Sequence, residues 1–447
     1  MPINTKYTGY DNEMKKVGRV RDFAEGSDAV KDKGETYLPK LGGDTKDEYE
    51  SYKTRGYLIP AVSPTARAIK GSIMRKPPIF TPTGLDYLID DIDGNGTSAE
   101  EFTGNMITEL LYAGGVGYLV EFTGKAVAKT YTRENIINFS KDYIILSQTY
   151  MVQDKNDKYI QTSQTEYLEL TFDKEGNYIQ NIWRNKGGDS AYEKTADSPI
   201  TPDNRGTPLT SIPFIYASTG KSGVADSDPL LLHLTNVNHD QYLLSTDHRH
   251  GLHWTALPTL FVFGELTDSD GNKIRLKIGA GSSNHIDDPE ARAELLEFTG
   301  QGLGAIKAAV DDDISTMASI GAKMMTGEGG GIKSAETSRI DASSETATLS
   351  ILANAVDSAM AAILLIIGEW AGVATPEFNV NRDFIDVKTD PQTLLAYLQV
   401  YQSGGMSLDS FLSLLEKGEL LPSGVTAKDE AGRLDQPGGD FEEVTEL

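Results

Sequence analysis

The chain has 447 residues, 39% hydrophobic and 24% charged, so it is long and apolar enough to bury a large core and is not expected to be globally disordered. Its 41 Lys+Arg and 66 Asp+Glu residues give a net charge of −25. This balance argues against a free-standing nucleic-acid binder held by phosphate neutralisation, because that mode needs a clustered positive surface. The chain has no cysteine, which excludes a disulfide framework, a thiolate zinc site and a thiol nucleophile.

The charge is unevenly distributed. Residues 1–80 carry 15 basic and 11 acidic residues, whereas the last 19 residues carry seven acidic residues and one arginine. We therefore expect an acidic, disordered tail over residues 422–447. The N-terminus lacks the apolar segment of a secretory signal, and the most apolar run, residues 359–367, is shorter than the ~20 residues of a membrane-spanning helix.

The first part of the chain is predicted to be helical after a loose beginning. Residues 1–46 are polar and show no clear periodicity, so we expect an N-terminal arm with at most one short helix. From Asp47 the pattern predicts a helix, a proline-marked break and a second helix over residues 65–72, which stops at Pro77 and Pro78.

The next part combines one helix with strands. Ser98 is a candidate N-cap for an amphipathic helix over residues 98–113, which the glycines of residues 114–117 end before a strand over 118–122. Residues 143–184 are rich in Tyr, Ile and Thr, with polar turns between the runs, and predict an antiparallel sheet. A polar loop over residues 186–208 and a short strand over residues 212–216 should follow.

Helical periodicity dominates the rest of the chain, over residues 229–250, 302–325, 335–367, 391–402 and 408–416, the last of these capped by Ser407. In the first of these helices one stripe carries Leu230, Leu234, Val237 and Leu244. Strand-like runs are found at 256–265, 272–281 and 377–385.

The helix that begins at Ala335 has neither Pro nor Gly for 33 residues, which corresponds to ~50 Å of helix. Such a helix is too long for a compact single-core domain and suits an element shared between layers of an assembly. Its apolar stripe consists of Leu349, Leu352, Val356, Met360, Ile363, Ile367 and Trp370.

Two motifs resemble ligand-binding loops. Asp91, Asp93, Asn95 and Gly96 match the start of a calcium loop, but position 12 is Phe102 where a bidentate Glu is required, so a turn capping the next helix is preferred. The run GEGGGIKS at residues 327–334 has Ile before its lysine and follows a helix, so it is not a P-loop.

Five of the six histidines lie between His233 and His253, but none is spaced i, i+4 with another, so we expect a polar helix face or a subunit contact and no zinc site. The chain shows no nucleophile elbow and no local acid/base pair. We therefore expect neither a metal, nor another cofactor, nor an enzymatic activity.

The order of these elements resembles that of tailed-bacteriophage portal proteins, in particular the portals long catalogued as a domain of unknown function. The resemblance covers most of residues 47–420. The segments that carry it are TRGYLIPAV, ARAIKGSIMRKPP, LLYAGGVGYLVEF, TPLTSIPF, LEFTGQGLGAIKAAVDDDISTMASIGAKMM and GGMSLDSFLSLLEKGELLP.

This resemblance implies an α+β fold with a portal-type architecture and a ring oligomer, usually of twelve subunits. After the arm (1–46), the parts would be the wing (47–225), stem helix 1 (226–251), the clip, a small α/β part (252–301), stem helix 2 (302–325), the tunnel loop (326–334), the long wing helix (335–371), a wing strand (372–390), the helical crown (391–421) and the tail (422–447).

The resemblance also implies the residues that face DNA. The tunnel loop would contribute Gly327, Gly329, Gly330, Gly331, Lys333 and Ser334. The stem candidates are Lys307, Asp311, Asp312, Asp313 and Lys323. Lys333 is the candidate for a phosphate contact, whereas Asp311, Asp312 and Asp313 would either line the lumen or pair with a neighbouring subunit.

The implied function is a channel at one capsid vertex, through which double-stranded DNA is packaged and ejected. Its implied partners are other copies of the chain (a homo-oligomer, as a dodecamer), double-stranded DNA, the terminase large subunit, a head-tail adaptor and the major capsid protein, with no membrane. The implied location is the virion, and the host cytoplasm during assembly. The alternatives are another virion ring protein, such as a connector or tail component without a packaging role, then a calcium-dependent binding module, and last an enzyme.

Overall fold

The structure is a computed structural model of the whole chain. It describes residues 2–122, 124–153, 157, 159–185, 192–204, 206–220, 223–224, 227–256, 259–263, 292–296, 300–326, 335–382, 384, 391–417, 420–421 and 425–434. The chain divides into two compact units, Met1–Arg382 and Asp383–Leu447. The fold contains helices and sheets, and every strand pair in the described part is antiparallel, so the fold class is α+β as predicted.

The N-terminal residues form packed helices, so the expectation of a loose arm over residues 1–46 is wrong. The helices are α1 (Tyr10–Glu25), α2 (Ser27–Asp32), the 3-10 turn η1 (Gly34–Thr36), α3 (Lys46–Arg55) and α4 (Val62–Ile73). Val17, Val20 and Phe23 of α1 are at most 1% exposed, and α1 packs against α4, α6 and α7. The buried face of α1 consists of only a few apolar residues separated by charged ones, so its helical periodicity is weak in the sequence. Tertiary packing stabilises the helix.

The centre of the first unit is a sheet with strand order β11-β2-β3, formed by β2 (Gly115–Phe122), β3 (Ala126–Thr132) and β11 (Phe214–Ser218). Helix α6 (Ala99–Ala113) precedes β2, and the Ser98 hydroxyl accepts a hydrogen bond from the backbone N–H of Glu101, which confirms the predicted N-cap. Gly114 ends α6 at φ 75°, and a Cβ there would lie 2.6 Å from the carbonyl oxygen of Asp228. The remaining glycines of this run belong to β2.

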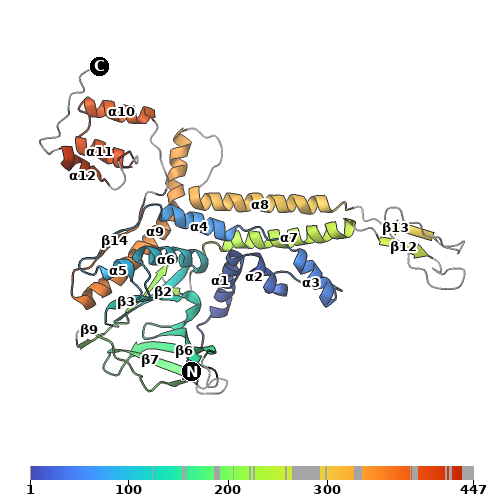
Figure 1. Cartoon of the computed structure of the whole chain (residues 1–447), viewed down its shortest axis with the longest axis horizontal. Coiled ribbons are helices and arrows are strands. Elements are labelled where there is room, and N and C mark those ends of the chain that lie inside the picture. Colours follow the sequence, from blue (N-terminus) through green and yellow to red (C-terminus); the bar gives the residue numbers. More distant parts are fainter. Residues whose placement is uncertain are drawn as a thin grey trace. The chain divides into compact units, whose positions relative to one another are not determined.

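A second sheet has the order β4-β5-β6-β7-β8 (Figure 1). Its strands are β4 (Ile136–Phe139), β5 (Ile144–Gln153), β6 (Gln161–Phe172), β7 (Tyr178–Asn185) and β8 (Tyr192–Lys194). The central strands β5 to β7 confirm the sheet predicted over residues 143–184. The stretch predicted as a loop also contains β8 and the short pair β9 (Asp203–Asn204) and β10 (Thr207–Pro208).

Two helices form an antiparallel pair, α7 (Leu232–Ala256) and α8 (Leu303–Thr326). Figure 1 shows α8 along one side of α7, with α1 and α3 along the other. The described part of the connection contains β12 (Thr259–Phe263) paired with β13 (Arg292–Leu296). The strand predicted over residues 272–281 lies outside the described residues.

The longest helix, α9, extends from Ala335 to Ala371 and confirms the helix predicted from Ala335. All seven residues of the predicted apolar stripe are at most 6% exposed. This stripe lies in the part of α9 that packs against α6, β2, β3 and β11. The strand β14 (Glu377–Asn379) follows and pairs with β1 (Ile79–Thr81), beside the short α5 (Tyr87–Asp90).

Residues Thr348–Ala371 of α9 are long and apolar enough to cross a membrane by length and composition, with a mean hydropathy of 2.0. Half of the apolar window is buried inside the molecule. A helix in a protein core has the same character, because it is apolar on every side that other elements cover.

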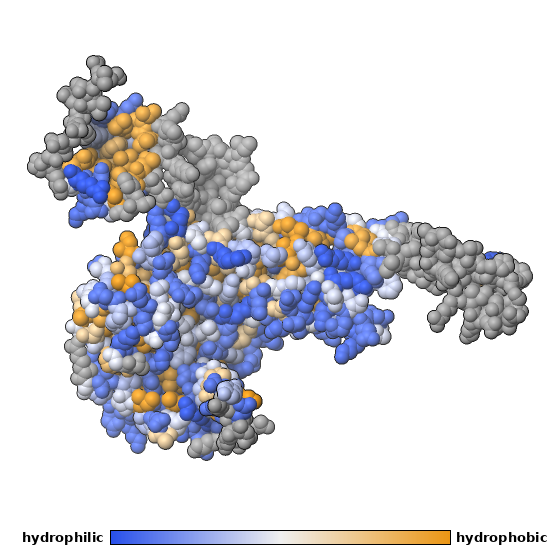
Figure 2. Space-filling view, in the orientation of Figure 1, coloured by the Kyte–Doolittle hydropathy of each residue, from blue (hydrophilic) through white to orange (hydrophobic). Residues whose placement is uncertain are grey.

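The second unit contains α10 (Pro391–Gln402), α11 (Leu408–Lys417) and α12 (Ala427–Leu434). Ser407 caps α11 by accepting a hydrogen bond from the Ser410 N–H, as predicted, and Tyr401 stacks on Phe411 with ring centroids 4.9 Å apart. Figure 2 shows a broad hydrophobic area on this unit. Helix α12 lies within residues 422–447, so that segment is not entirely the disordered tail that we expected; residues 435–447 lie outside the described part.

The buried stripe of α9 leads to the first prediction. Leu352→Ala should lower the free energy of unfolding by about 2–5 kcal/mol, because the side chain is fully buried and its loss leaves a cavity. Ile351→Ala on the exposed face of the same helix is the control and should have a much smaller effect, since Ile351 is 47% exposed. Urea unfolding followed by circular dichroism would measure both, and equal losses would contradict the packing described for α9.

Candidate functional site

The candidate functional site is the helix pair of α7 and α8 together with the residues that hold it to the sheets. The two helices are in close contact near Gly251, where a Cβ would lie 2.5 Å from Leu303 Cδ2. Further along the pair, Asp240 of α7 lies close enough to Asp313 of α8 for its negative charge to raise the pKa of Asp313. Because low residue numbers on one helix meet high residue numbers on the other, the two stem candidates run antiparallel.

The buried face of α7 is polar, which corrects the predicted apolar stripe. Of the four residues predicted for that stripe, only Leu234 is buried. The side chains that are buried along α7 include the polar residues Thr235, Asn238, Gln241, Ser245 and Thr246.

These polar side chains hydrogen-bond an extended segment that precedes Pro60. Asn238 donates to the carbonyl of Ile59 (2.9 Å), and the Gln241 side-chain carbonyl accepts from the Ile59 N–H (3.1 Å). Gln241 and Ser245 also donate to the carbonyl of Tyr57. Buried backbone groups need partners, and here α7 supplies them in place of a neighbouring strand. The sequence could not reveal this, because the partners are about 180 residues apart.

The structure places only part of the predicted DNA-facing set. Lys307, Asp311 and Asp312 are exposed on α8, and Asp313 is half-buried. The side chain of Lys323 and all residues of the predicted tunnel loop lie outside the described part, namely Gly327, Gly329, Gly330, Gly331, Lys333 and Ser334.

Asp313 lies at the contact between α7 and α8 with one carboxylate oxygen, Oδ2, buried and without a hydrogen-bond partner. Burial raises the pKa of this carboxyl, and the negative charges of Asp240 and Asp312 raise it further. The three carboxylates therefore repel one another at the helix pair.

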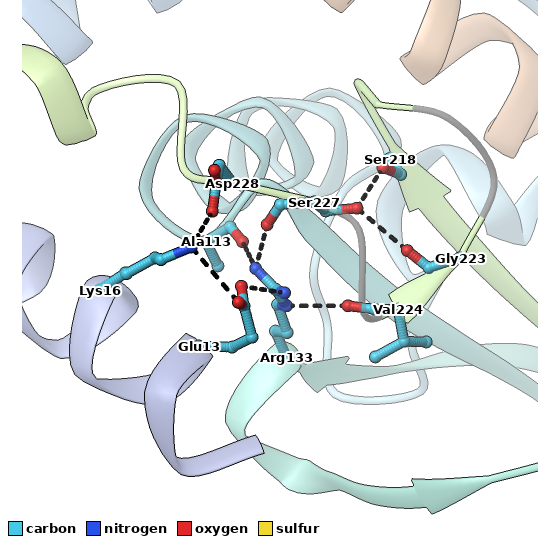
Figure 3. A network of polar contacts seen from close by, with 9 residues as sticks. All are labelled: Glu13, Lys16, Ala113, Arg133, Ser218, Gly223, Val224, Ser227 and Asp228. Atoms are coloured by element: carbon cyan, nitrogen blue, oxygen red, sulfur yellow. Dashed lines mark hydrogen bonds and ion pairs between the residues drawn. The ribbon is translucent and has the colours of Figure 1, made fainter. Parts of the chain in front are cut away.

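A buried arginine connects the base of the helix pair to the sheets and to α1 (Figure 3). Arg133, in the 3-10 turn η2 (Arg133–Asn135), is fully buried and donates hydrogen bonds to the carbonyls of Ala113, Val224 and Ser227. Its charge is balanced by Glu13 of α1, at 3.1 Å. A buried charge is tolerated only with this kind of complete pairing.

Lys16 extends this network along α1. Its ammonium group lies 2.7 Å from Asp228, in the segment that leads into α7, and 3.3 Å from Glu13. Figure 3 shows these side chains converging from α1 and from the segment that leads into α7. No sequence motif indicated Arg133, because its partners are backbone carbonyls and a carboxylate 120 residues away.

A second arginine fixes α1 to α6 and η2. Arg21 forms a two-pronged contact with Glu109 of α6, with N–O distances of 3.1 and 2.6 Å, and also binds Glu134. The contact with Arg21 lowers the pKa of Glu134 against the opposing effect of burial. The two carboxylates on this side of α6 are thus both bound to Arg21.

The calcium-like loop is a turn that leads into α6, as preferred from the sequence. The carboxylate of Asp91 binds Lys125 and the Gly96 N–H, and that of Asp93 accepts from the Asn95 and Thr97 N–H groups. Among the described residues no group of three or more His, Asp or Glu side chains could hold a metal ion.

The histidines of α7 make structural contacts. His239 packs edge-on against Phe23 and Tyr37, with its Nε2 at 2.8 Å from the Tyr37 carbonyl. His250 accepts a hydrogen bond from Trp254, and burial together with the nearby charge of Arg55 lowers its pKa. These two histidines thus make contacts within the chain, and the expected polar helix face or subunit contact stays a prediction.

Comparisons with known proteins give one family match and several structural likenesses. A family model described as a domain of unknown function (DUF4055) matches residues 229–371, which include α7, α8 and α9. No curated protein matches the chain.

Solved structures similar to the chain come from gene transfer agent (GTA) particles. A chain from the neck of an empty particle is 10% identical, covering 85% of this chain and 96% of its own, at a TM-score of 0.41. A chain of the native virion is 12% identical, with coverages of 89% and 98% and a TM-score of 0.41. A chain from the neck of the native particle is 13% identical, with coverages of 86% and 96% and a TM-score of 0.39.

The buried arginine leads to the second prediction. Arg133→Met should lower the free energy of unfolding by about 3–5 kcal/mol, because it leaves three buried carbonyls without their donor and Glu13 without its buried arginine. Lys129→Met is the control: it breaks the partly exposed pair with Glu121 and should cost at most about 1 kcal/mol. Chemical unfolding would measure both, and similar costs would mean that the Arg133 network is not needed for stability.

The third prediction concerns Asp313. Because the pKa of the Asp313 carboxyl is raised in the folded state, the folded protein binds its proton more tightly than the unfolded chain does. Protonated Asp313 therefore favours folding below the unfolded pKa. This contribution is lost as the pH rises through the folded pKa. Asp313→Asn should therefore raise the melting temperature at pH 7, and the gain should shrink as the pH falls below about 4.

Asp311→Asn, on the exposed side of α8, is the matched control and should gain less. Melting temperatures of the unchanged protein and of the two variants, measured across pH, would test this prediction. A gain for Asp313→Asn that does not depend on pH would contradict the assigned cause.

Proposed function

We propose that this chain is a portal protein: one subunit of a ring, as a dodecamer, that forms the channel through which double-stranded DNA enters and leaves a capsid. The observation that carries the proposal is the helix pair of α7 and α8, connected through β12 and β13 and followed by the long α9. A pair of this kind, placed side by side in a ring, would form the wall of a tube.

The anchoring of the helix pair supports this proposal. Away from β12 and β13, α7 contacts α1 and α4 and hydrogen-bonds residues 57–59, and α8 contacts α4 and α9. The Arg133 network binds the segment that enters α7 to the sheets. A channel wall under load needs such a rigid base.

The open surface of α8 also supports assembly from several copies. Figure 2 shows hydrophobic side chains along α8 within a hydrophilic surface, and Ile314 is 37% exposed. An exposed apolar strip on a long helix would be covered by a neighbouring subunit.

The charge of the chain fits a conduit that does not hold DNA tightly. A ring of subunits at −25 each would repel the duplex overall, so phosphate contacts would be confined to a few places. We propose Lys333 of the tunnel loop, with Lys307 and Lys323 behind it, as such contacts. The terminase large subunit would dock on residues 252–301 and be replaced by a head-tail adaptor, and the major capsid protein would surround the ring.

The alternative is another ring-forming virion protein, such as a connector or tail component, without a packaging role. Electron micrographs of the purified full-length protein test what the two share: both require rings with a central hole wide enough for a duplex of ~20 Å. A monodisperse monomer at high concentration would overturn both. Packaging separates them, because only a portal is needed for DNA to enter the capsid.

The fourth prediction concerns the tunnel loop. Lys333→Glu should leave ring formation intact and reduce DNA packaging or retention, because each reversed charge removes one phosphate contact and adds repulsion. Lys174→Glu, in the exposed turn between β6 and β7, is the control with the same change of charge. Packaged DNA per particle would be measured. Equal packaging by both variants would mean that the loop assignment is wrong.

A further inference from the structure

One stretch of this acidic chain has no acidic residue. From Ser51 to Leu85 the sequence contains six lysines and arginines and no Asp or Glu, whereas the chain's average composition would place about five acidic residues in 35. The middle of this stretch is α4. Its charge is therefore opposite to that of the molecule as a whole.

Helix α4 has one apolar and one basic side. Val62, Ala66, Ile69 and Ile73 are at most 3% exposed and form the side that faces the interior. Arg67 is exposed and Lys70 is half-buried, and they lie three residues apart on the same side of the helix.

Glycine in α6 makes room for Lys70. A Cβ at Gly104 would lie 2.7 Å from Lys70 Cε and 2.9 Å from Nζ, so the lysine side chain lies across α6 where that helix has no side chain of its own. The ammonium group is thereby held against the protein surface. A cation that is already placed loses less conformational entropy on binding an anion.

Neither cation has a carboxylate partner among the described residues. Arg67 lies near Tyr112 of α6, since its charge lowers the pKa that burial raises there, and Glu109 acts on the same phenol. The two oxygens of Glu109, however, are bound by Arg21, which also takes Glu134. Arg67 and Lys70 therefore keep their positive charges available to an external anion.

The position of α4 connects this surface with the helix pair. A Cβ at Gly321 of α8 would lie 3.3 Å from Thr65 Oγ1 of α4, so α4 contacts α8 five residues before that helix ends at Thr326. The predicted tunnel loop follows directly. The basic side of α4 thus belongs to the end of the helix pair from which that loop leaves.

From these observations we infer that Arg67 and Lys70 bind backbone phosphates of double-stranded DNA. This inference rests on the proposed function, and it assigns the phosphate contacts to a helix besides the tunnel loop. Lys and Arg on a helix without neighbouring carboxylates recognise phosphates irrespective of base sequence. One such pair per subunit gives a ring of weak contacts, which a moving duplex can exchange one at a time.

The test uses the full-length oligomer and a 30-base-pair duplex of mixed sequence at low salt. Arg67→Glu/Lys70→Glu should weaken DNA binding at least tenfold and reduce the slope of log K against log salt by about 1 or more, since each lost phosphate contact contributes about 0.9. Fluorescence anisotropy would measure binding and mass photometry would measure assembly.

The matched control is Lys141→Glu/Lys174→Glu. These lysines are exposed in the turns before β5 and before β7, and the change of charge is the same. The control should bind DNA as the unchanged protein does. Equal weakening of both double variants would mean that only the net charge matters and would overturn the inference.

Three further outcomes separate the inference from the proposed function. If rings form but the unchanged protein does not bind the duplex, the phosphate site is wrong and the portal proposal remains. If the α4 double variant fails to assemble while the control assembles, α4 contacts an acidic surface of a neighbouring copy and the DNA inference is overturned. If no ring forms from the unchanged chain, the portal proposal itself fails.

A cross-link gives an independent measurement in the assembled particle. Because the chain has no cysteine, Gly71→Cys introduces a unique thiol beside Lys70, at a position where a Cβ would meet no atom within 4 Å. Labelled with a photoreactive group, it should cross-link to packaged DNA, whereas Lys174→Cys should not. Cross-linking that is equal at both positions would contradict the placement of the phosphate site on α4.

Discussion

The buried charge of Arg133 is the constraint on which the arrangement of the first unit depends. A guanidinium in the interior must have its donors satisfied, and here the partners come from α1, from the end of α6 and from the segment that enters α7. These three parts of the chain cannot move independently without breaking a buried hydrogen bond or ion pair of Arg133. The contacts of Arg21 with Glu109 and Glu134 are a second set of ion pairs from α1, which join it to α6 and η2.

The neighbours of α7 explain why its buried face is polar. The helix is held between α8 on one side and the N-terminal helices on the other, and the extended residues 57–59 lie against it. Amide and hydroxyl side chains hydrogen-bond that segment, and directional bonds of this kind fix register more strictly than apolar contacts do. Hydrogen bonds of this kind suit a helix pair that must not slide along its own axis.

The distribution of charge gives the same molecule two kinds of surface. Carboxylates repel one another at Asp240, Asp312 and Asp313, while the basic side of α4 has no acidic neighbour that is not already bound. The net charge of −25 thus conceals a local positive surface, because composition averages over residues that the fold separates. In a ring of proposed subunits, both surfaces would be repeated around the axis.

Several features could be predicted from the sequence alone. The boundaries of α8, the length and buried stripe of α9, the antiparallel strands β5 to β7 and the Ser98 and Ser407 caps all depend on neighbours within one element, which the sequence shows directly. The packing of residues 1–46, the buried face of α7 and the role of Arg133 depend mostly on partners between 88 and 217 residues away. Only the tertiary structure decided them, because a hydrogen bond or ion pair across that separation leaves no periodic trace in the chain.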